Sequence, residues 1–381
     1  MTEKKGDILP VMVFLLIIFG LSIGNLAYPE RTFSEKENRY LAVKPEFTWR
    51  SLYSGSFSGD FEKYTTDQFI YRDTWTEVKA LCEIARLKRD NNGVYIGSDG
   101  YLLGKYQESD INKVRLKENI DYLVGFVNKF SKQLGQNRMT VVIVPMSSSI
   151  LKDKLPPFAY GFDQDAMIDS IKTRTSRSFV DIRQALGENS HQYIYYKTDH
   201  HWTSLGAYIA YDKWCRSIGE EPVPLSSLDI REVTSEFYGT YYSKANLYTI
   251  SPDSISIFVP KNEAAYRVIY NAGEREEDTL YNLSYLAKRD KYSLFLNGNN
   301  PLVKIETHVG NGRNLLIVKD SFAHTFAPLA ALSFETVHMI DLRHYNMSLS
   351  QYISDNNITD VLVLYSTMNL STDANLHKLN K

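Results

Sequence analysis

The sequence of 381 residues lacks several features that would place it in a well-defined class of protein. It has two cysteines, Cys82 and Cys215, which excludes a disulfide framework and any zinc site built from four thiolates. Whether these two thiols pair is left open. It also lacks an excess of charge, because 43 Lys and Arg stand against 45 Asp and Glu. Nothing therefore attracts a polyanion over long range, and nucleic acid is not an expected partner.

Long apolar runs are absent except for one near the N-terminus. Residues 8–27 carry no charge, and a helix of that length spans roughly 30 Å, the thickness of a bilayer's hydrocarbon core. Lys4 and Lys5 precede the run, so the positive-inside rule keeps this end in the cytoplasm. We predict that residues 1–28 are a cytoplasmic tip and single-pass signal anchor in the cell membrane, with the remaining chain outside the cytoplasm. A cleaved signal peptide is the alternative, but its apolar region usually has only about 7–15 residues.

The rest of the chain has the composition and patterning of a folded α/β protein, with 43% hydrophobic and 23% charged residues. Residues 29–60 are turn-rich without a sustained period, and we interpret them as a juxtamembrane tether. Helical spacing begins at Phe61, a hairpin with an Asp99-Gly100 turn is expected in residues 94–103, and an amphipathic helix in residues 116–134. We therefore predict one α/β domain over residues 61–381.

Four continuous apolar runs are typical of strands that are covered on both faces. They alternate with helical or irregular segments, which favours a mostly parallel central sheet. The predicted strands are residues 140–146, 314–321, 336–342 and 360–366.

The first motif with chemical potential is Thr198-Asp199-His200-His201-Trp202, directly before a predicted helix that Thr203 would cap. A carboxylate two residues before a histidine in a tight turn can hold the imidazole in one tautomer and stabilise its protonated form. This is the base half of a nucleophilic triad. The alternative is a helix start with one buried, hydrogen-bonded histidine.

The second motif is Asp320-Ser321-Phe322, at the point where a buried strand gives way to a helix. Ligands of parallel sheets lie at the carboxyl ends of the strands, and a serine at the following turn presents its hydroxyl there, near backbone N–H groups that can hold an oxyanion. A plain helix cap is the alternative.

Together these motifs resemble the DHHW protein family, named for the Asp-His-His-Trp found here at 199–202. The early DNNGVYIGSDGYLL stretch and the late IDLRHYN stretch also match, in the same order. The family is similar to the alginate acetylation proteins of the SGNH hydrolase-like superfamily, whose Thr-Asp-x-His-Trp and Asp-Ser-Phe motifs correspond to 198–202 and 320–322. Lys319 stands where those proteins commonly have glycine.

The resemblance implies an SGNH hydrolase-like three-layer fold and a triad of Ser321 as nucleophile, His201 as general base and Asp199 as its orienting carboxylate. It implies an extracytoplasmic O-acyltransferase or acylesterase, acting with an acyl donor on a cell-envelope or exported polysaccharide. A multi-pass membrane acyltransferase is an expected partner. Which polymer and acyl group are involved, and whether a sugar or water accepts the acyl group, is left open. The alternative is a non-catalytic envelope subunit that binds glycan or docks to such an acyltransferase.

Five further residues are candidates for substrate binding or an oxyanion site, each with a structural alternative. His200 suits either packing or a substrate contact, and Trp202 either sugar stacking or the core. Gly298 and Asn299 could donate to an oxyanion or form a plain turn. Arg343 could bind an anionic group or form a structural salt bridge.

No metal and no cofactor is expected. Histidines at 191, 200, 201 and 324 raise the possibility of zinc, but their spacing matches no regular ligand pattern.

Overall fold

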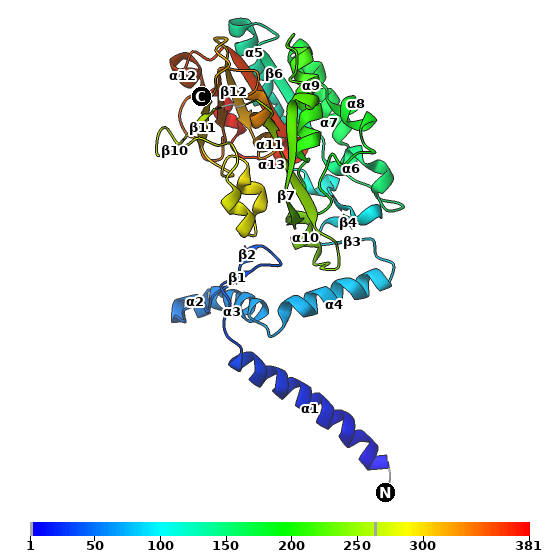
Figure 1. Ribbon diagram of the computed structural model, residues 1–381. Coiled ribbons are helices and arrows are strands. Elements are labelled where there is room, and N and C mark those ends of the chain that lie inside the picture. The colour runs from blue at the N-terminus through cyan, green and yellow to red at the C-terminus, as the bar shows by residue number, and fades with distance from the viewer. Residues whose placement is uncertain (1–2, 263–264) are drawn as a thin grey trace. The chain divides into compact units, whose positions relative to one another are not determined.

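The computed structural model describes residues 3–262 and 265–381, with side chains from residue 8 onward (Figure 1). The chain divides into two units, the first comprising residues 1–88 with 246–249 and the second 89–245 with 250–381. The predicted boundaries at residues 28 and 60 both fall within the first unit, and the predicted domain organisation remains a prediction.

The apolar run near the N-terminus lies in helix α1 (Glu3–Ala27). Its segment Ile8–Ala27 is long and apolar enough to cross a membrane. Most large apolar side chains of this segment are exposed, with Leu16 at 74% and Leu26 at 88%. A helix of this kind suits both the anchor and the signal-peptide interpretation.

Residues 29–88 contain more regular structure than their sequence predicts. The elements are β1 (Phe33–Ser34), β2 (Arg39–Tyr40), α2 (Trp49–Tyr53), α3 (Ser56–Asp67) and α4 (Arg72–Ala85). The helix expected from Phe61 is two helices, because Tyr71 adopts a left-handed φ of 54° before α4. At the end of α3, the Asp67 carboxylate accepts hydrogen bonds from the Arg39 guanidinium at 2.5 and 2.8 Å and from Ala42 N at 2.8 Å. This carboxylate fixes the β1–β2 segment to the helices.

A seven-stranded sheet forms the centre of the second unit, in the order β10-β9-β11-β13-β12-β14-β6. All four predicted buried strands lie in this sheet, as β6, β12, β13 and β14. The strands are β6 (Met139–Val144), β9 (Arg267–Tyr270), β10 (Arg275–Glu277), β11 (Leu302–Glu306), β12 (Asn314–Lys319), β13 (Thr336–Ile340) and β14 (Asp360–Ser366).

The four predicted strands are adjacent and parallel, with β12 paired to both β13 and β14, and β14 paired to β6. The expected mixed α/β fold with a mostly parallel sheet is therefore confirmed. The other edge is antiparallel, through the β13–β11, β11–β9 and β9–β10 pairings. The sequence does not predict this edge because its strands are short and carry charged residues, which weakens the apolar signal.

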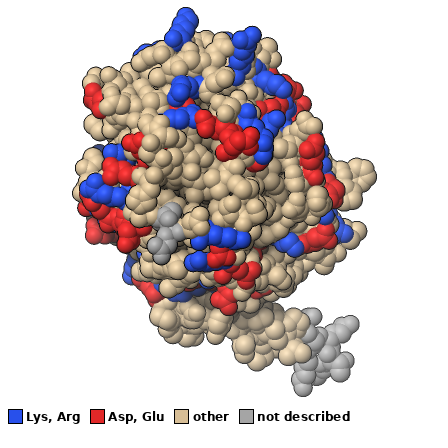
Figure 2. All heavy atoms as spheres, turned by 45° about the horizontal axis from the view of Figure 1, so that its top comes forward, with Lys and Arg blue, Asp and Glu red and all other residues tan. Residues whose placement is uncertain are grey.

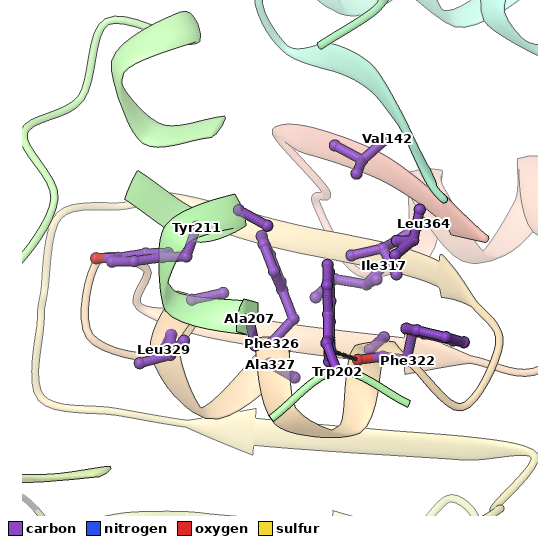
Figure 3. Close-up of a cluster of buried hydrophobic side chains, with 14 of the residues drawn as sticks. Val142, Trp202, Ala207, Tyr211, Ile317, Phe322, Phe326, Ala327, Leu329 and Leu364 are labelled. Atoms are coloured by element: carbon purple, nitrogen blue, oxygen red, sulfur yellow. Dashed lines mark hydrogen bonds between the residues drawn. The ribbon is translucent and has the colours of Figure 1, made fainter. Parts of the chain in front are cut away.

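Both faces of the sheet are covered, as continuous apolar strands predict. Alternate residues of each strand enter two separate cores: Val142 and Ile317 lie in one, and Ile143 and Leu316 in the other. Helices α9 (Ser204–Ser217) and α11 (Ala323–Ala330) pack on the first face (Figure 3). Helices α5 (Lys113–Leu134), α7 (Gln164–Thr175) and α12 (Leu349–Asp355) pack on the second.

The remaining elements are smaller and surround the sheet. The predicted hairpin is confirmed, since β4 (Val94–Ile96) pairs antiparallel with β5 (Leu102–Gly104) and with β3 (Asp90–Asn91). Strands β7 (Leu228–Phe237) and β8 (Asp253–Pro260) form a second antiparallel pair. The short helices are α6 (Ser147–Ile150), α8 (Arg183–Glu188), α10 (Thr240–Ala245) and α13 (Thr367–Thr372).

The two cysteines do not pair, because Cys82 is an exposed free thiol and Cys215 a buried one. Acidic and basic side chains are interspersed over the face shown in Figure 2. This distribution agrees with the small net charge of −2 and provides no extended surface of one sign on that face.

Candidate active site

The segment that carries Asp199 and His201 is a tight turn held by a buried carboxylate. Asp253, at the start of β8 and 2% exposed, accepts hydrogen bonds from Lys197 N at 2.8 Å, Thr198 N at 2.7 Å and Thr198 Oγ1 at 2.5 Å. The Tyr193 hydroxyl donates to the same carboxylate. The turn then enters α9, whose N-cap is Thr203, as predicted. Four donors converging on one acid leave this turn little freedom to move.

Three predicted site residues form a continuous hydrogen-bonded chain. The Asp199 Oδ1 to His201 Nδ1 distance is 2.5 Å. On the other side of the imidazole, His201 Nε2 lies 2.7 Å from Ser321 Oγ. Asp199 and His201 are buried, whereas Ser321 is partly exposed. The geometry therefore links a solvent-accessible hydroxyl to a buried imidazole and a carboxylate.

The segment at Gly239 and Thr240 completes the environment of Asp199, and the sequence does not reveal it. Asp199 Oδ2 accepts from Thr240 N at 2.8 Å and from Thr240 Oγ1 at 2.9 Å. A Cβ at Gly239 would lie 2.2 Å from the Asp199 Cβ, so only glycine permits this close approach. A Gly-Thr pair after a strand carries no distinctive signal, and only its packing on Asp199 identifies it.

Ser321 follows β12, a strand from which the chain crosses to one side of the sheet and later returns on the other side. Strand β12 pairs with β13 on one side and with β14 on the other, and the chain leaves β12 for β13 before it returns to β14. Parallel sheets bind ligands outside the carboxyl ends of strands at such a position. Asp320 and Phe322, on either side of Ser321, are buried at 2% and 0% exposure. Only the serine of this motif reaches solvent.

Asp320 shapes the turn and does not contact His201. Its Oδ1 accepts from Phe322 N at 3.0 Å, and its Oδ2 accepts from Ser366 N at 2.7 Å and Asn369 Nδ2 at 2.8 Å. These bonds join the end of β12 to the end of β14 and the start of α13. The carboxylate thus holds Ser321 at a defined place above the sheet.

Burial and the neighbouring charges shift the pKa values of both Asp199 and His201. Burial alone would raise the pKa of Asp199, but the adjacent imidazoles of His200 and His201 hold it well below its ordinary value. Burial lowers the pKa of His201, the charge of His200 lowers it further, and Asp199 opposes both. A neutral His201 with a free electron pair on Nε2 can accept a proton from Ser321 near neutral pH.

The imidazole of His201 contacts two other rings. Its centroid lies 3.8 Å from that of the tilted His200 ring and 3.9 Å from that of the Tyr292 ring, which stacks on it at an interplanar angle of 11°. The Tyr292 hydroxyl also donates to Ser321 O at 3.3 Å. His200 Nδ1 pairs with Thr240 Oγ1 at 2.6 Å, and its side chain remains 25% exposed. The sequence could not identify Tyr292, because it is one of 27 tyrosines without a motif of its own.

Trp202 belongs to the core and fastens the two motifs to each other. Its ring is 0% exposed, which leaves no surface for sugar stacking and corrects that candidate role. Its indole N–H donates to Phe322 O at 3.0 Å (Figure 3). The same N–H donates to Thr325 Oγ1 at 2.7 Å. The hydrogen bond to Phe322 O joins the residue after His201 to the residue after Ser321.

Gly298, Asn299 and Arg343 form no hydrogen bond with His201 or Ser321 among the described residues. The Gly298 N–H donates to Phe295 O at 3.1 Å within a turn, so it is not available for an oxyanion. Arg343 forms the salt bridge that was its structural alternative, with N–O distances to Asp341 of 2.6 and 2.9 Å. Asn299 Oδ1 accepts from the same guanidinium at 3.1 Å.

A second cluster of ionisable groups lies buried beneath the serine turn. Lys319 and Asp341 are 1% and 0% exposed, and Lys319 Nζ lies 3.2 Å from Asp341 Oδ2. The same ammonium lies 2.8 Å from His324 Nε2. Burial alone would raise the pKa of Asp341, but Arg343 and Lys319 lower it to about 2. Lys319 thus serves as a buried ion-pair partner at the end of β12.

Asp199, His200 and His201 could approach one metal ion, since each offers a ligand atom within 4.8 Å of the others. In the observed arrangement those atoms bond to one another, to Thr240 and to Ser321. A metal ion bound by these atoms would have to break these contacts.

Comparison with known proteins yields structural relatives and a match to one family model. A DHHW family protein from Eubacterium siraeum is 26% identical with a TM-score of 0.63, over 76% of this chain and 96% of that one. PatB1 of Bacillus cereus with a sulfonyl adduct is 22% identical with a TM-score of 0.60, over 74% and 99%. The O-acetyltransferase domain of Pseudomonas putida AlgJ is 12% identical with a TM-score of 0.44, over 74% and 93%. No curated protein sequence matches significantly.

A family model also matches the chain. The model described as DHHW protein covers residues 96–340, which include both motifs, the hairpin strand β5 and most of the central sheet. This range is more than half of the 381 residues. The chain therefore belongs to the DHHW protein family.

Proposed function

We propose that this chain is an O-acyltransferase or acylesterase with an SGNH hydrolase-like fold that modifies an envelope or exported polysaccharide through Ser321, His201 and Asp199. The observation that carries the proposal is the 2.7 Å contact between Ser321 Oγ and His201 Nε2, with Asp199 bonded to the opposite ring nitrogen. A partly exposed hydroxyl at the carboxyl end of a central parallel strand supports the same role.

The proposed reaction has two steps that use the same proton acceptor. Ser321 Oγ attacks the acyl carbonyl carbon while its proton passes to His201 Nε2, and a new C–O bond forms. The imidazolium returns that proton to the leaving oxygen as the donor's C–O bond breaks, which leaves an acyl-enzyme. A hydroxyl then attacks the acyl carbon and loses its proton to His201, and the imidazolium returns this proton to Ser321 Oγ as the ester bond to the serine breaks. Acyl transfer results when the attacking hydroxyl belongs to a sugar, and hydrolysis when it belongs to water.

The buried side of the imidazole supports this role physically. The Asp199 carboxylate stabilises the imidazolium that forms in each step, and its two bonds to Thr240 keep it oriented. The Tyr292 face at 3.9 Å gives a second favourable contact with a cationic ring.

The direct test is covalent labelling of the serine, which does not depend on guessing the natural donor. Phenylmethanesulfonyl fluoride forms a sulfonyl ester with an activated serine, and intact-mass and peptide spectra locate the adduct. We expect Ser321 to be labelled, His201→Ala to label far more slowly, and Ser321→Ala not to label there. Hydrolysis of 4-nitrophenyl acetate should fall by at least about 10⁴-fold in Ser321→Ala. Labelling of surface residues at equal rates in all three proteins would contradict the proposal and favour a non-catalytic subunit.

We further propose that the catalytic unit lies outside the cytoplasm, tethered by Ile8–Ala27, where a multi-pass membrane acyltransferase could supply the acyl group. The apolar helix and the preceding Lys4 and Lys5 support this orientation. Alkaline phosphatase fused after residue 60 should be active, because that enzyme folds only outside the cytoplasm. An inactive fusion together with an active cytoplasmic reporter at the same site would overturn the orientation.

A further inference from the structure

A cavity separate from the Ser321–His201 contact opens at the carboxyl end of β6. Its volume is about 300 Å³, and its walls include Tyr95, Tyr106, Tyr160 and Gln164. This volume is at the lower end of the range found for small-molecule sites. The proposed chemistry at Ser321 does not use any of these residues.

Hydrogen bonds connect the cavity to the serine turn. Gln164 Oε1 accepts from Met146 N, just beyond β6, at 2.9 Å and from Thr367 Oγ1, just beyond β14, at 2.6 Å. The residue before Thr367 is Ser366, whose N–H donates to Asp320 Oδ2 at 2.7 Å. The cavity and Ser321 therefore both lie at the carboxyl ends of the parallel strands, and the start of α13 connects them.

The cavity is also connected to the histidine turn. The Tyr106 hydroxyl lies 2.7 Å from the Tyr241 hydroxyl, and the Tyr241 ring lies 6.2 Å from the ring of His200. One wall of the cavity is thus linked to the element that holds Ser321, and another to the neighbours of His201.

The side-chain amide of Gln164 offers a hydrogen-bond donor to a polar ligand in the cavity. Gln164 is 5% exposed and lines the cavity, and its Oε1 is held by two donors. Its Nε2 donates to no atom within the residues that the structure describes, and it is not one of the buried atoms without a partner, so solvent reaches it. A ligand oxygen in the cavity could take the place of that solvent as the acceptor.

The charges in the wall favour a neutral ligand over a polyanion. Lys152 and Asp165 pair at 3.2 Å, and Asp163 caps α7 by accepting from Ala166 N at 2.9 Å. The carboxylates accept hydrogen bonds from ligand hydroxyls, whereas they repel phosphate or carboxylate groups. The aromatic rings complement the apolar C–H face of a pyranose, and Tyr160 is 68% exposed at this site.

We propose that this cavity is a subsite that binds a neutral sugar residue of the acceptor polysaccharide, close to the residue that is acylated. The subsite rests on the proposed function for its role in acyl transfer, but its sugar binding can be measured without turnover.

The test uses the full chain carrying Ser321→Ala, reconstituted in lipid nanodiscs to avoid glycoside detergents. Saturation-transfer NMR and calorimetry measure binding of chitohexaose, cellohexaose and maltohexaose. We expect at least one of these neutral oligosaccharides to bind and Tyr160→Ala to weaken its affinity about tenfold, while Tyr160→Phe retains the stacking ring and most of the affinity.

Phe158→Ala is the matched control, since Phe158 lies on the same loop, is 100% exposed and does not line the cavity. Binding of none of the three oligosaccharides, or an equal loss in Phe158→Ala and Tyr160→Ala, would overturn the subsite. Specific sugar binding without labelling of Ser321 would retain the subsite and remove the proposed catalysis. Labelling of Ser321 without sugar binding would retain the proposed catalysis and overturn the subsite.

Discussion

His201 and His324 are both buried histidines with a charged neighbour, but the neighbours have opposite sign. His201 Nδ1 faces the Asp199 carboxylate at 2.5 Å, whereas His324 Nε2 faces the Lys319 ammonium at 2.8 Å. Burial lowers the pKa of both imidazoles, and the ammonium lowers that of His324 further, to well below its ordinary value. At His201 the carboxylate acts in the opposite direction.

The opposite charges of their neighbours give these two histidines different roles. A carboxylate partner stabilises a proton arriving at the opposite ring nitrogen, so His201 can serve as a base toward Ser321. An ammonium partner donates its own hydrogen bond to the imidazole and disfavours protonation, so His324 stays neutral. His324 Nδ1 has no hydrogen-bond partner within the described residues, which makes proton relay through this ring unfavourable.

The largest effect should come from removing the charge that distinguishes the two histidines. Asp199→Asn keeps the side-chain shape but favours the wrong tautomer of His201, so kcat/KM for 4-nitrophenyl acetate should fall by about 10⁴-fold. His324→Gln is the matched change in the other cluster and should cost about tenfold or less. Steady-state kinetics on both purified variants measure the two losses in kcat/KM. A comparable loss in the two variants would contradict the different roles assigned to His201 and His324.

A second prediction concerns stability in the buried cluster. Asp341→Asn leaves the Lys319 ammonium, 1% exposed, without an anion, and should lower the free energy of unfolding by about 3 kcal/mol. Lys319→Met should cost less, because Asp341 retains its two bonds to Arg343. Urea denaturation at pH 7 measures both values. A larger loss in Lys319→Met would show that the ammonium serves mainly as the donor to His324.

The smallest expected effect is a shift of the pH profile. The charge of His200 lowers the pKa of His201, so His200→Gln should raise it. Since the neutral imidazole is the base, kcat/KM rises with pH through the His201 pKa, and this acid limb should move to higher pH in the variant. A profile from pH 4 to 8 measures the shift, and an acid limb that moves to lower pH would contradict the assigned electrostatics.

The four buried strands could be predicted because each is an uninterrupted apolar run, a pattern that burial on both faces requires. The edge strands β9, β10 and β11 could not, since they have only three to five residues and each contains at least one charged side chain. Tyr71 likewise divides a region with continuous helical spacing, and its backbone conformation depends on contacts that periodicity does not contain.

Part of the site was similarly accessible from the sequence. The motifs at 199–202 and 320–322 identified the carboxylate, imidazole and hydroxyl that now lie in one chain of hydrogen bonds. The sequence could not reveal Thr240, Asp253 and Tyr292, because each acts through a contact made by folding and lacks a local motif. It also left Trp202 and Arg343 with two interpretations each, which burial and the Asp341 salt bridge distinguish.

By itself, the sequence determined the buried strands and the pairing of Asp199 with His201, because apolar spacing and a two-residue separation are properties of the local chain. The tertiary structure alone decided that this pair meets a hydroxyl 120 residues further along the chain. That meeting depends on β12 lying between β13 and β14 and on Trp202 bonding to Phe322 O. Long-range packing sets such distances, and the spacing of residues in a sequence does not encode them locally.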